Sequence, residues 1–102
     1  MSSWVKVSKA DDIGPEGLAV TVGGEPVLLV KKGDEIFAIA NVCSHQEMEL
    51  RGGELEGGSW VCPHHGARFG LGDGRALSMP AVDDIKVYRV TLENGDVLVE
   101  EE

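Results

Sequence analysis

The chain has 102 residues, enough for one domain, and its 42% apolar and 26% charged residues are typical of a globular rather than a disordered protein. Its formal charge of −9 argues against DNA, RNA and anionic membranes, because each of those partners requires a basic face. No run of 18 apolar residues is present, and the chain reaches a charge at Lys6 without a signal-like segment. We therefore expect a cytoplasmic protein with no membrane partner.

Short β-rich segments separated by turn residues dominate the sequence, and no amphipathic helix of three turns is present. The segments expected to form strands are, in chain order, residues 4–7, 18–22, 27–30, 36–40, 59–61, 67–69, 85–92 and 97–99. Residues 8–11 fit a capping box and predict one helical turn. Asn94-Gly95 predicts a type I′ hairpin between the last two segments. The expected fold class is all-β.

Residues 41–80 differ in character from the rest of this single domain of residues 1–102. Glycine is dense here and the apolar runs are short. We interpret this stretch as a small loop-rich subdomain inserted in a β scaffold made of residues 1–40 and 81–102. A core of that size is too small to fix its own loops, and a bound metal would supply the missing constraint.

The two cysteines and three histidines of the chain all lie within a 23-residue window. Cys43-Ser44-His45 is followed, after 16 residues, by Cys62-Pro63-His64-His65-Gly66. Each tight turn presents one thiolate and at least one imidazole toward one point. In a reducing compartment such clustering indicates a metal rather than a disulfide. Two sulfur and two nitrogen donors suit zinc or an iron–sulfur cluster.

This C-x-H and C-x-x-H-G pattern resembles the signature of the Rieske [2Fe–2S] family, in which two Cys bind one iron and two His bind the other. The resemblance implies that Cys43 and Cys62 hold the inner iron and that His45 and His65 hold the outer iron. It also implies a Rieske-like antiparallel β-sandwich or barrel scaffold with a cluster-binding subdomain. A third covering loop that contains proline, as in this family, corresponds to residues 78–80, which end in Pro80.

Five further residues are expected to lie around the cluster: Gln46, His64, Gly66, Ala67 and Pro80. His64 is interpreted as a surface residue that flanks the cluster, because the spacing favours His65 as the ligand. Gly66 is expected to let the backbone approach the cluster, with a plain turn glycine as the alternative. Gln46 either shapes the first loop or is a solvated polar residue, and Pro80 either shields the cluster or is an ordinary loop proline.

The residues after Gly66 also predict where the reduction potential lies. High-potential members of the family carry a disulfide between the two loops and Ser and Tyr hydroxyls bonded to the cluster sulfurs. This chain has no further cysteine, and Ala67 and Phe69 stand at the positions of those hydroxyls. We therefore expect a potential near the bottom of the Rieske range of about −150 to +300 mV.

The number of histidines excludes an oxygenase. The mononuclear iron of an oxygenase requires two His in addition to the two that bind the cluster, and only one of the three histidines remains. The resemblance instead implies a non-enzymatic, monomeric ferredoxin component of a bacterial aromatic-ring-hydroxylating dioxygenase system. Its partners would be a flavin-dependent ferredoxin reductase, supplied by NAD(P)H, and a terminal oxygenase. Two alternatives remain open at this point: the small subunit of an assimilatory nitrite reductase, and a zinc-stabilised interaction module.

Overall fold

The computed structural model describes residues 3–42, 49–63, 66–77 and 84–101. In these residues the chain forms strands and one short 3₁₀ turn, η1 (Ala10–Asp12). The strands are β1 (Ser3–Lys9), β2 (Leu18–Val22), β3 (Glu25–Lys32), β4 (Glu35–Ala40), β5 (Glu54–Glu56), β6 (Ser59–Val61), β7 (Arg68–Gly70), β8 (Val87–Tyr88), β9 (Val90–Glu93) and β10 (Asp96–Glu101). The predicted all-β fold class is confirmed. No helix in this part of the chain is long and apolar enough to cross a membrane.

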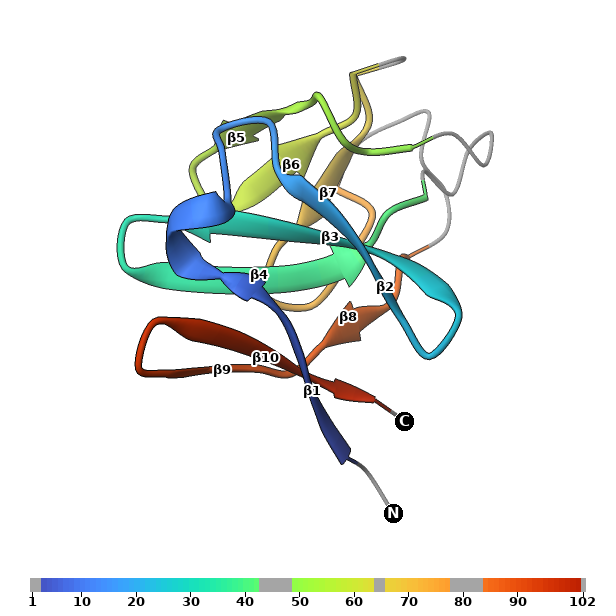
Figure 1. Cartoon of the computed structure of the whole chain (residues 1–102). Coiled ribbons are helices and arrows are strands. Elements are labelled where there is room, and N and C mark those ends of the chain that lie inside the picture. The colour runs from blue at the N-terminus through green and yellow to red at the C-terminus, as the bar shows by residue number, and fades with distance from the viewer. Residues whose placement is uncertain (1–2, 43–48, 64–65, 78–83, 102) are drawn as a thin grey trace.

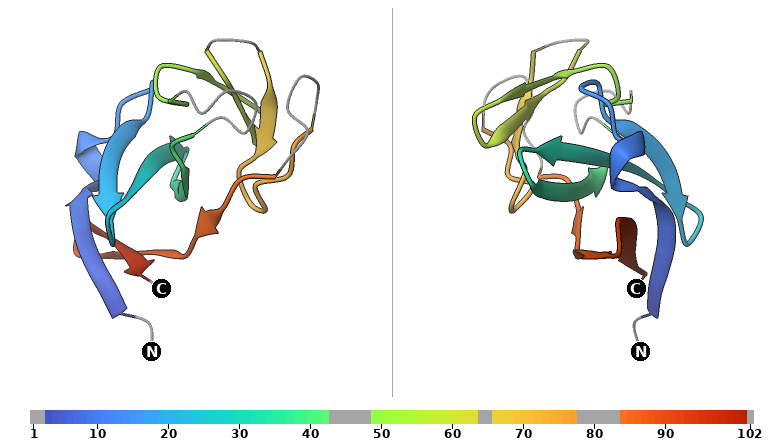
Figure 2. Two further views of the ribbon diagram at one scale, coloured as in Figure 1. Left: turned by 90° about the vertical axis from the view of Figure 1, so that its right-hand side faces the viewer. Right: turned by 60° about the vertical axis from the view of Figure 1, so that its left-hand side comes forward.

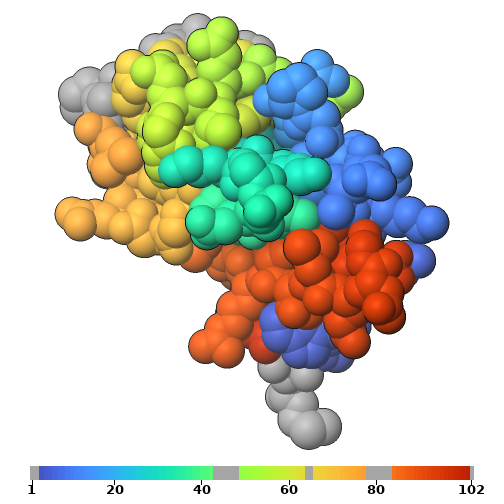
Figure 3. Space-filling model, turned by 90° about the vertical axis from the view of Figure 1, so that its left-hand side faces the viewer, coloured from blue at the N-terminus to red at the C-terminus, as the bar shows by residue number. Residues whose placement is uncertain are grey.

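The strands form three antiparallel sheets that follow one another in space (Figure 1). The terminal sheet has the strand order β1-β10-β9, the middle sheet β2-β3-β4-β8, and the loop-bearing sheet β5-β6-β7. On the face shown in Figure 3, the yellow-green surface of the loop-bearing sheet, the blue-green β3–β4 turn and the orange-red C-terminal strands succeed one another from top to bottom. The middle sheet therefore lies between the other two.

Strand β3 shows why the middle sheet takes that place. Its four central residues, Val27, Leu28, Leu29 and Val30, are all buried. Because successive side chains of a strand point to opposite faces, the run supplies two cores at once. Leu28 and Val30 enter the core shared with the loop-bearing sheet, which we call the site core. Val27 and Leu29 enter the core shared with the terminal sheet, which we call the scaffold core.

The terminal sheet joins the two ends of the described chain. Strand β1 pairs with β10 over nearly its whole length, and β10 pairs in turn with β9. The β9–β10 connection is the predicted type I′ turn, because Asn94 and Gly95 both have positive φ, 53° and 83°. In Figure 2 the terminal sheet lies at the end of the molecule away from the loop-bearing sheet. Strands β1 and β10, which stand at the two ends of the described chain, thus lie away from the loop-bearing sheet.

Two local expectations need correction. The single strand expected over residues 85–92 is divided at Arg89, because β8 pairs with β4 in the middle sheet whereas β9 pairs with β10 in the terminal sheet. The apolar positions change phase at this crossing, from Ile85 and Val87 to Val90 and Leu92, and a single strand over residues 85–92 does not account for that change. The helical turn after β1 is present, but no side chain caps it. Ser8 belongs to β1 instead, and its Oγ donates to the Lys9 carbonyl at 3.3 Å.

Candidate metal centre

Of the four expected metal ligands, the structure describes Cys62. The expected ligands Cys43, His45 and His65 lie outside the described residues, as do Gln46, His64 and Pro80. Within the described part of the chain, no group of three His, Cys, Asp or Glu is arranged to hold a metal ion. The structure therefore shows the supports of the expected loops and one of the four donors.

Cys62 begins the loop that connects β6 to β7. Its backbone N–H donates to the Ala67 carbonyl at 2.7 Å, and its own carbonyl accepts from the Gly66 N–H at 3.1 Å. These two bonds close a four-residue hairpin loop over residues 63–66. Gly66 has a φ of +72°, in the left-handed region that glycine adopts without steric cost. The turn reading of Gly66 thus has direct structural support, and it is compatible with close approach of the backbone to a cluster.

The Cys62 side chain lies on the buried face of this hairpin. Only 2% of Cys62 is exposed, its thiol is free, and it belongs to the site core. The strand register pairs Trp60 with Phe69 and Val61 with Arg68, so that Cys62 stands opposite Ala67 at the next position. Trp60, Phe69 and Ala67 are likewise fully buried. The thiol is therefore held on a packed surface rather than on a free loop.

Asn41 closes the base of the first expected loop. Its Oδ1 accepts from the backbone N–H of Leu50 at 2.9 Å and of Arg51 at 3.0 Å, and its Nδ2 donates to Glu49 Oε1 at 3.2 Å. Asn41 is itself buried, and its backbone N–H donates to the Pro26 carbonyl. The segment that contains Cys43 and His45 thus departs from and returns to one fixed point at the end of β4.

The third expected loop, which contains Pro80, is closed in a similar way. Asp84 Oδ1 accepts from the Ala76 N–H at 2.9 Å, and the Leu77 N–H donates to the Arg68 carbonyl at 2.8 Å. Unlike the bonds of Asn41, the bond of Asp84 is exposed. Asn41 and Asp84 were both missed by sequence reasoning, because Asn and Asp outside strands are ordinarily interpreted as turn residues. The only available signal was their position immediately beside the loops.

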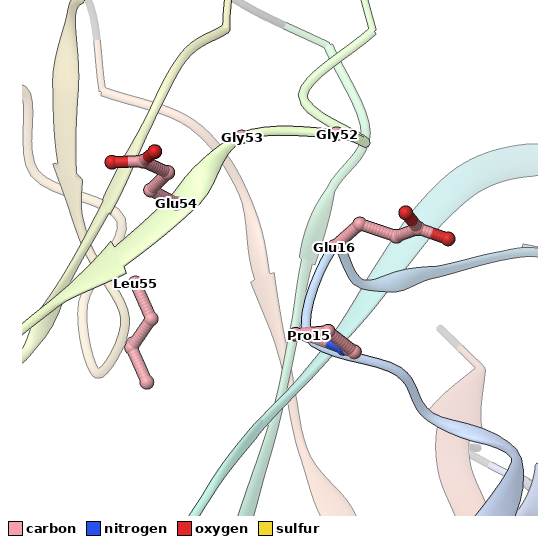
Figure 4. A pocket seen from close by; sticks show the side chains of 6 residues that line it. All are labelled: Pro15, Glu16, Gly52, Gly53, Glu54 and Leu55. Atoms are coloured by element: carbon pink, nitrogen blue, oxygen red, sulfur yellow. The ribbon is translucent and has the colours of Figure 1, made fainter.

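Two hollows lie beside these supports. The smaller, of about 310 Å³, is lined by Gly52, Gly53, Glu54, Val61, Cys62, Pro63 and Gly66. The larger, of about 450 Å³, is lined by Pro15, Glu16, Gly52, Gly53, Glu54 and Leu55 (Figure 4). In Figure 4 the carboxylates of Glu16 and Glu54 extend in opposite directions, so they do not converge on a cation. Of these two hollows, the smaller is the one lined by an expected metal ligand, Cys62.

The chain is similar to known proteins over nearly its whole length. The Rieske [2Fe–2S] domain family matches residues 3–89. A ferredoxin component of naphthalene 1,2-dioxygenase/salicylate 5-hydroxylase systems from Ralstonia sp. is 38% identical over 102 residues, covering 98% of this chain and 97% of the relative.

Two solved structures give the same result in three dimensions. The ferredoxin of carbazole 1,9a-dioxygenase from Nocardioides aromaticivorans is 31% identical with a TM-score of 0.91, covering 98% of this chain and 99% of that chain. A complex of reduced oxygenase and oxidized ferredoxin in carbazole 1,9a-dioxygenase contains a chain that is 33% identical, with a TM-score of 0.86 and coverage of 97% and 94%. The similarity thus extends over nearly the whole of each chain.

Proposed function

This chain belongs to the Rieske [2Fe–2S] domain family, and from that premise we propose that it passes single electrons from an NAD(P)H-dependent flavin reductase to a terminal Rieske oxygenase. The observation that carries the proposal is the nearly full-length likeness to ferredoxin components of dioxygenase systems. One of the similar structures is a ferredoxin in complex with its oxygenase. The chain acts as an electron carrier in this proposal, and substrate chemistry takes place on the oxygenase.

We assign Cys43 and Cys62 to the inner iron and His45 and His65 to the outer iron. The burial of the Cys62 thiol, the hollow beside it and the positive φ of Gly66 fit this donor set. When bound, the cluster accepts and releases one electron at a time, at a potential raised by the two neutral imidazoles. The assignment is consistent with residues 41–80 serving as a cluster-binding subdomain within one domain of residues 1–102.

The residues around Cys62 give this carrier a low potential in our proposal. Ala67 stands opposite Cys62 and is fully buried, so the cross-strand neighbour of the thiol offers no hydroxyl. Phe69, two pairs further along, also lacks a hydroxyl and packs in the site core. A hydrogen bond to a charged group is worth roughly 1.5–3 kcal/mol. Without such bonds the reduced, more negative state is less stabilised, which lowers the potential.

Gln46, His64 and Pro80 keep their expected places around the cluster as part of the proposal, with Pro80 covering it and His64 flanking it. The formal charge of −9 steers the carrier toward basic patches on its two partners, and docking is transient. The carrier works as a cytoplasmic monomer, in aromatic hydrocarbon catabolism. The choice of aromatic substrate belongs to the oxygenase.

The test is electron transfer from the chemically reduced chain to a Rieske oxygenase of the naphthalene or carbazole type, followed by stopped-flow absorbance. We expect oxidation of the carrier with matching reduction of the oxygenase, and a rate that falls as salt rises from about 50 to about 500 mM. A reduced chain that transferred no electron to such oxygenases would contradict the proposal. Transfer to a sirohaem-containing nitrite reductase subunit alone would favour the nitrite-reductase alternative instead.

A further inference from the structure

The backbone of Leu50 joins the supports of the two expected ligand loops. Its N–H donates to Asn41 Oδ1 at 2.9 Å, and its carbonyl accepts from Trp60 Nε1 at 2.7 Å. The same carbonyl also accepts from the Gly53 N–H at 3.2 Å. Asn41, Leu50 and Trp60 are all buried. One peptide segment thus connects the end of β4 to strand β6.

This connection matters because the two loops begin on different sheets. Asn41 follows β4 of the middle sheet, whereas Trp60 lies in β6 of the loop-bearing sheet, and these sheets share no strand. Among the residues that the structure describes, no ladder of backbone hydrogen bonds therefore joins the two sheets. The apolar contacts of the site core join the two sheets, but such contacts are not directional. The bonds through Leu50 supply direction as well as contact.

Asn41 and Trp60, the two side chains that bond the backbone of Leu50, also occupy matching positions in the sequence. Asn41 stands two residues before Cys43, and Trp60 stands two residues before Cys62. We propose that Asn41 and Trp60 are positioning residues, which act through Leu50 to fix the two cysteine ligands at the separation that the cluster requires. This inference rests on the proposed function, because it assumes that both cysteines bind the cluster. We call the three residues the Leu50 clamp.

Substitutions in the Leu50 clamp should be destabilising, because its polar atoms are buried and would lose their hydrogen-bond partners. Replacing Asn41 by Ala leaves the backbone N–H groups of Leu50 and Arg51 without their acceptor. Replacing Trp60 by Phe removes one donor while keeping an aromatic ring in the site core. A buried polar group that loses its partner pays its desolvation cost. In Trp60→Phe the Leu50 carbonyl keeps its bond from the Gly53 N–H, and the smaller ring also leaves a cavity in the site core. Asn41→Ala, which leaves the apolar site core intact, is therefore the sharper variant.

The experiment compares cluster retention in the as-isolated protein with that in Trp60→Phe, Asn41→Ala and the double variant. Release of iron to a chelator is followed by absorbance, and the electron paramagnetic resonance (EPR) spectrum of each reduced protein is recorded. Ser59→Ala is the matched control, because Ser59 is buried and its Oγ donates to the Glu56 carbonyl at 2.8 Å, at the other end of β6 from Cys62.

We expect iron release to become about tenfold faster in Asn41→Ala, in which two backbone N–H groups lose their acceptor. In Trp60→Phe, in which the Leu50 carbonyl keeps the Gly53 N–H, we expect release to be severalfold faster. The increase in the iron-release rate of the double variant should be smaller than the product of the increases in the two single variants, because both residues act through Leu50. The EPR features of both single variants should shift or broaden, whereas those of Ser59→Ala should not.

Iron release and EPR spectra that match the control in both single variants would overturn the clamp while leaving the cluster assignment intact. Release rates that changed without any change in the spectra would also overturn it, because the residues would then stabilise the fold without positioning the ligands. A parent protein that bound neither iron nor sulfide would overturn the proposed function together with the clamp.

Discussion

The terminal and middle sheets are built differently from the loop-bearing sheet. Strands β1 and β3 have 7 and 8 residues, whereas β5, β6 and β7 have 3 each. The scaffold core is made of aliphatic side chains. The site core contains, in addition, the two largest fully buried side chains, Trp60 and Phe69, together with the thiol of Cys62. The region that carries the expected chemistry therefore has the least regular secondary structure.

This difference indicates that the terminal and middle sheets supply stability, whereas the loop-bearing region carries the expected function. Long strands and aliphatic burial make the scaffold independent of any bound group. Around the expected ligand loops, a few hydrogen bonds at Asn41, Asp84 and Cys62 hold the ends of the loops, and the cluster completes the structure in our proposal. The two regions should consequently respond differently to removal of the cluster and to mutation.

Removing a cysteine ligand should have the largest effect. We expect Cys62→Ser to abolish cluster binding, so that iron falls from about two per chain to almost none. The loop-bearing region should then become sensitive to limited proteolysis within residues 41–80, while the terminal and middle sheets stay resistant. Mass spectrometry of the fragments measures both. Cleavage that began in β3 or β10 would show that the scaffold also depends on the cluster.

Leu28 and Leu29 allow the two cores to be compared in one strand. They are neighbours in β3, both have 0% exposure, and they enter the site core and the scaffold core respectively. Replacing either by Ala should lower the free energy of unfolding by about 2–5 kcal/mol, through lost burial and a residual cavity. Only Leu28→Ala should also accelerate iron release to a chelator. Equal acceleration in both variants would mean that the two cores are not separable.

Adding a hydroxyl beside Cys62 should raise the reduction potential. A Ser at position 67 would place an Oγ on the cross-strand neighbour of the thiol. At roughly 1.5–3 kcal/mol per bond to a charged group, we expect Ala67→Ser to raise the midpoint by up to about 60–130 mV in voltammetry. Ala38→Ser, the same change in the scaffold core, is the control and should leave the midpoint unchanged. A midpoint above about +100 mV in the unmodified protein would contradict the low-potential assignment.

Gly53 tests how closely the loop-bearing sheet is packed. A Cβ at this position would overlap the Val61 carbonyl and lie 2.8 Å from Trp60 Nε1. We expect Gly53→Ala to destabilise the protein by about 1–3 kcal/mol in denaturant unfolding, because the backbone must shift to admit the methyl group. Gly58→Ala, where the new Cβ meets nothing within 4 Å, is the matched control and should be neutral or slightly stabilising. Equal stability of the two variants would argue against the tight junction at Leu50.

Sequence patterns predicted the scaffold well, since alternation and glycine turns located β2, β3, β4 and β10. Strand β5 escaped notice because Glu54-Leu55-Glu56 offers one apolar residue between two charges. The crossing at Arg89 did leave a signal, the change of apolar phase between Val87 and Val90, but the single predicted strand did not take it into account. The pairing of β1 with β10 joins segments about ninety residues apart, and no local pattern encodes such a contact.

For the site, the spacing of Cys and His predicted the ligand set, because that chemistry depends on residue type and short-range spacing. The supports were not predicted. Asn41 and Trp60 form hydrogen bonds with the backbone N–H and carbonyl of Leu50, and such backbone groups have no signature in the sequence. The assignment of Cys43, Cys62, His45 and His65 as ligands stays a prediction.

The most direct test of the central claim is the EPR spectrum of the anaerobically purified, dithionite-reduced protein, taken together with its iron, sulfide and zinc content. We predict a rhombic signal with the low average g of mixed His and Cys ligation, and about two irons per chain. A colourless, EPR-silent protein with about one zinc per chain would contradict the account, and the same four residues would then form a structural zinc site.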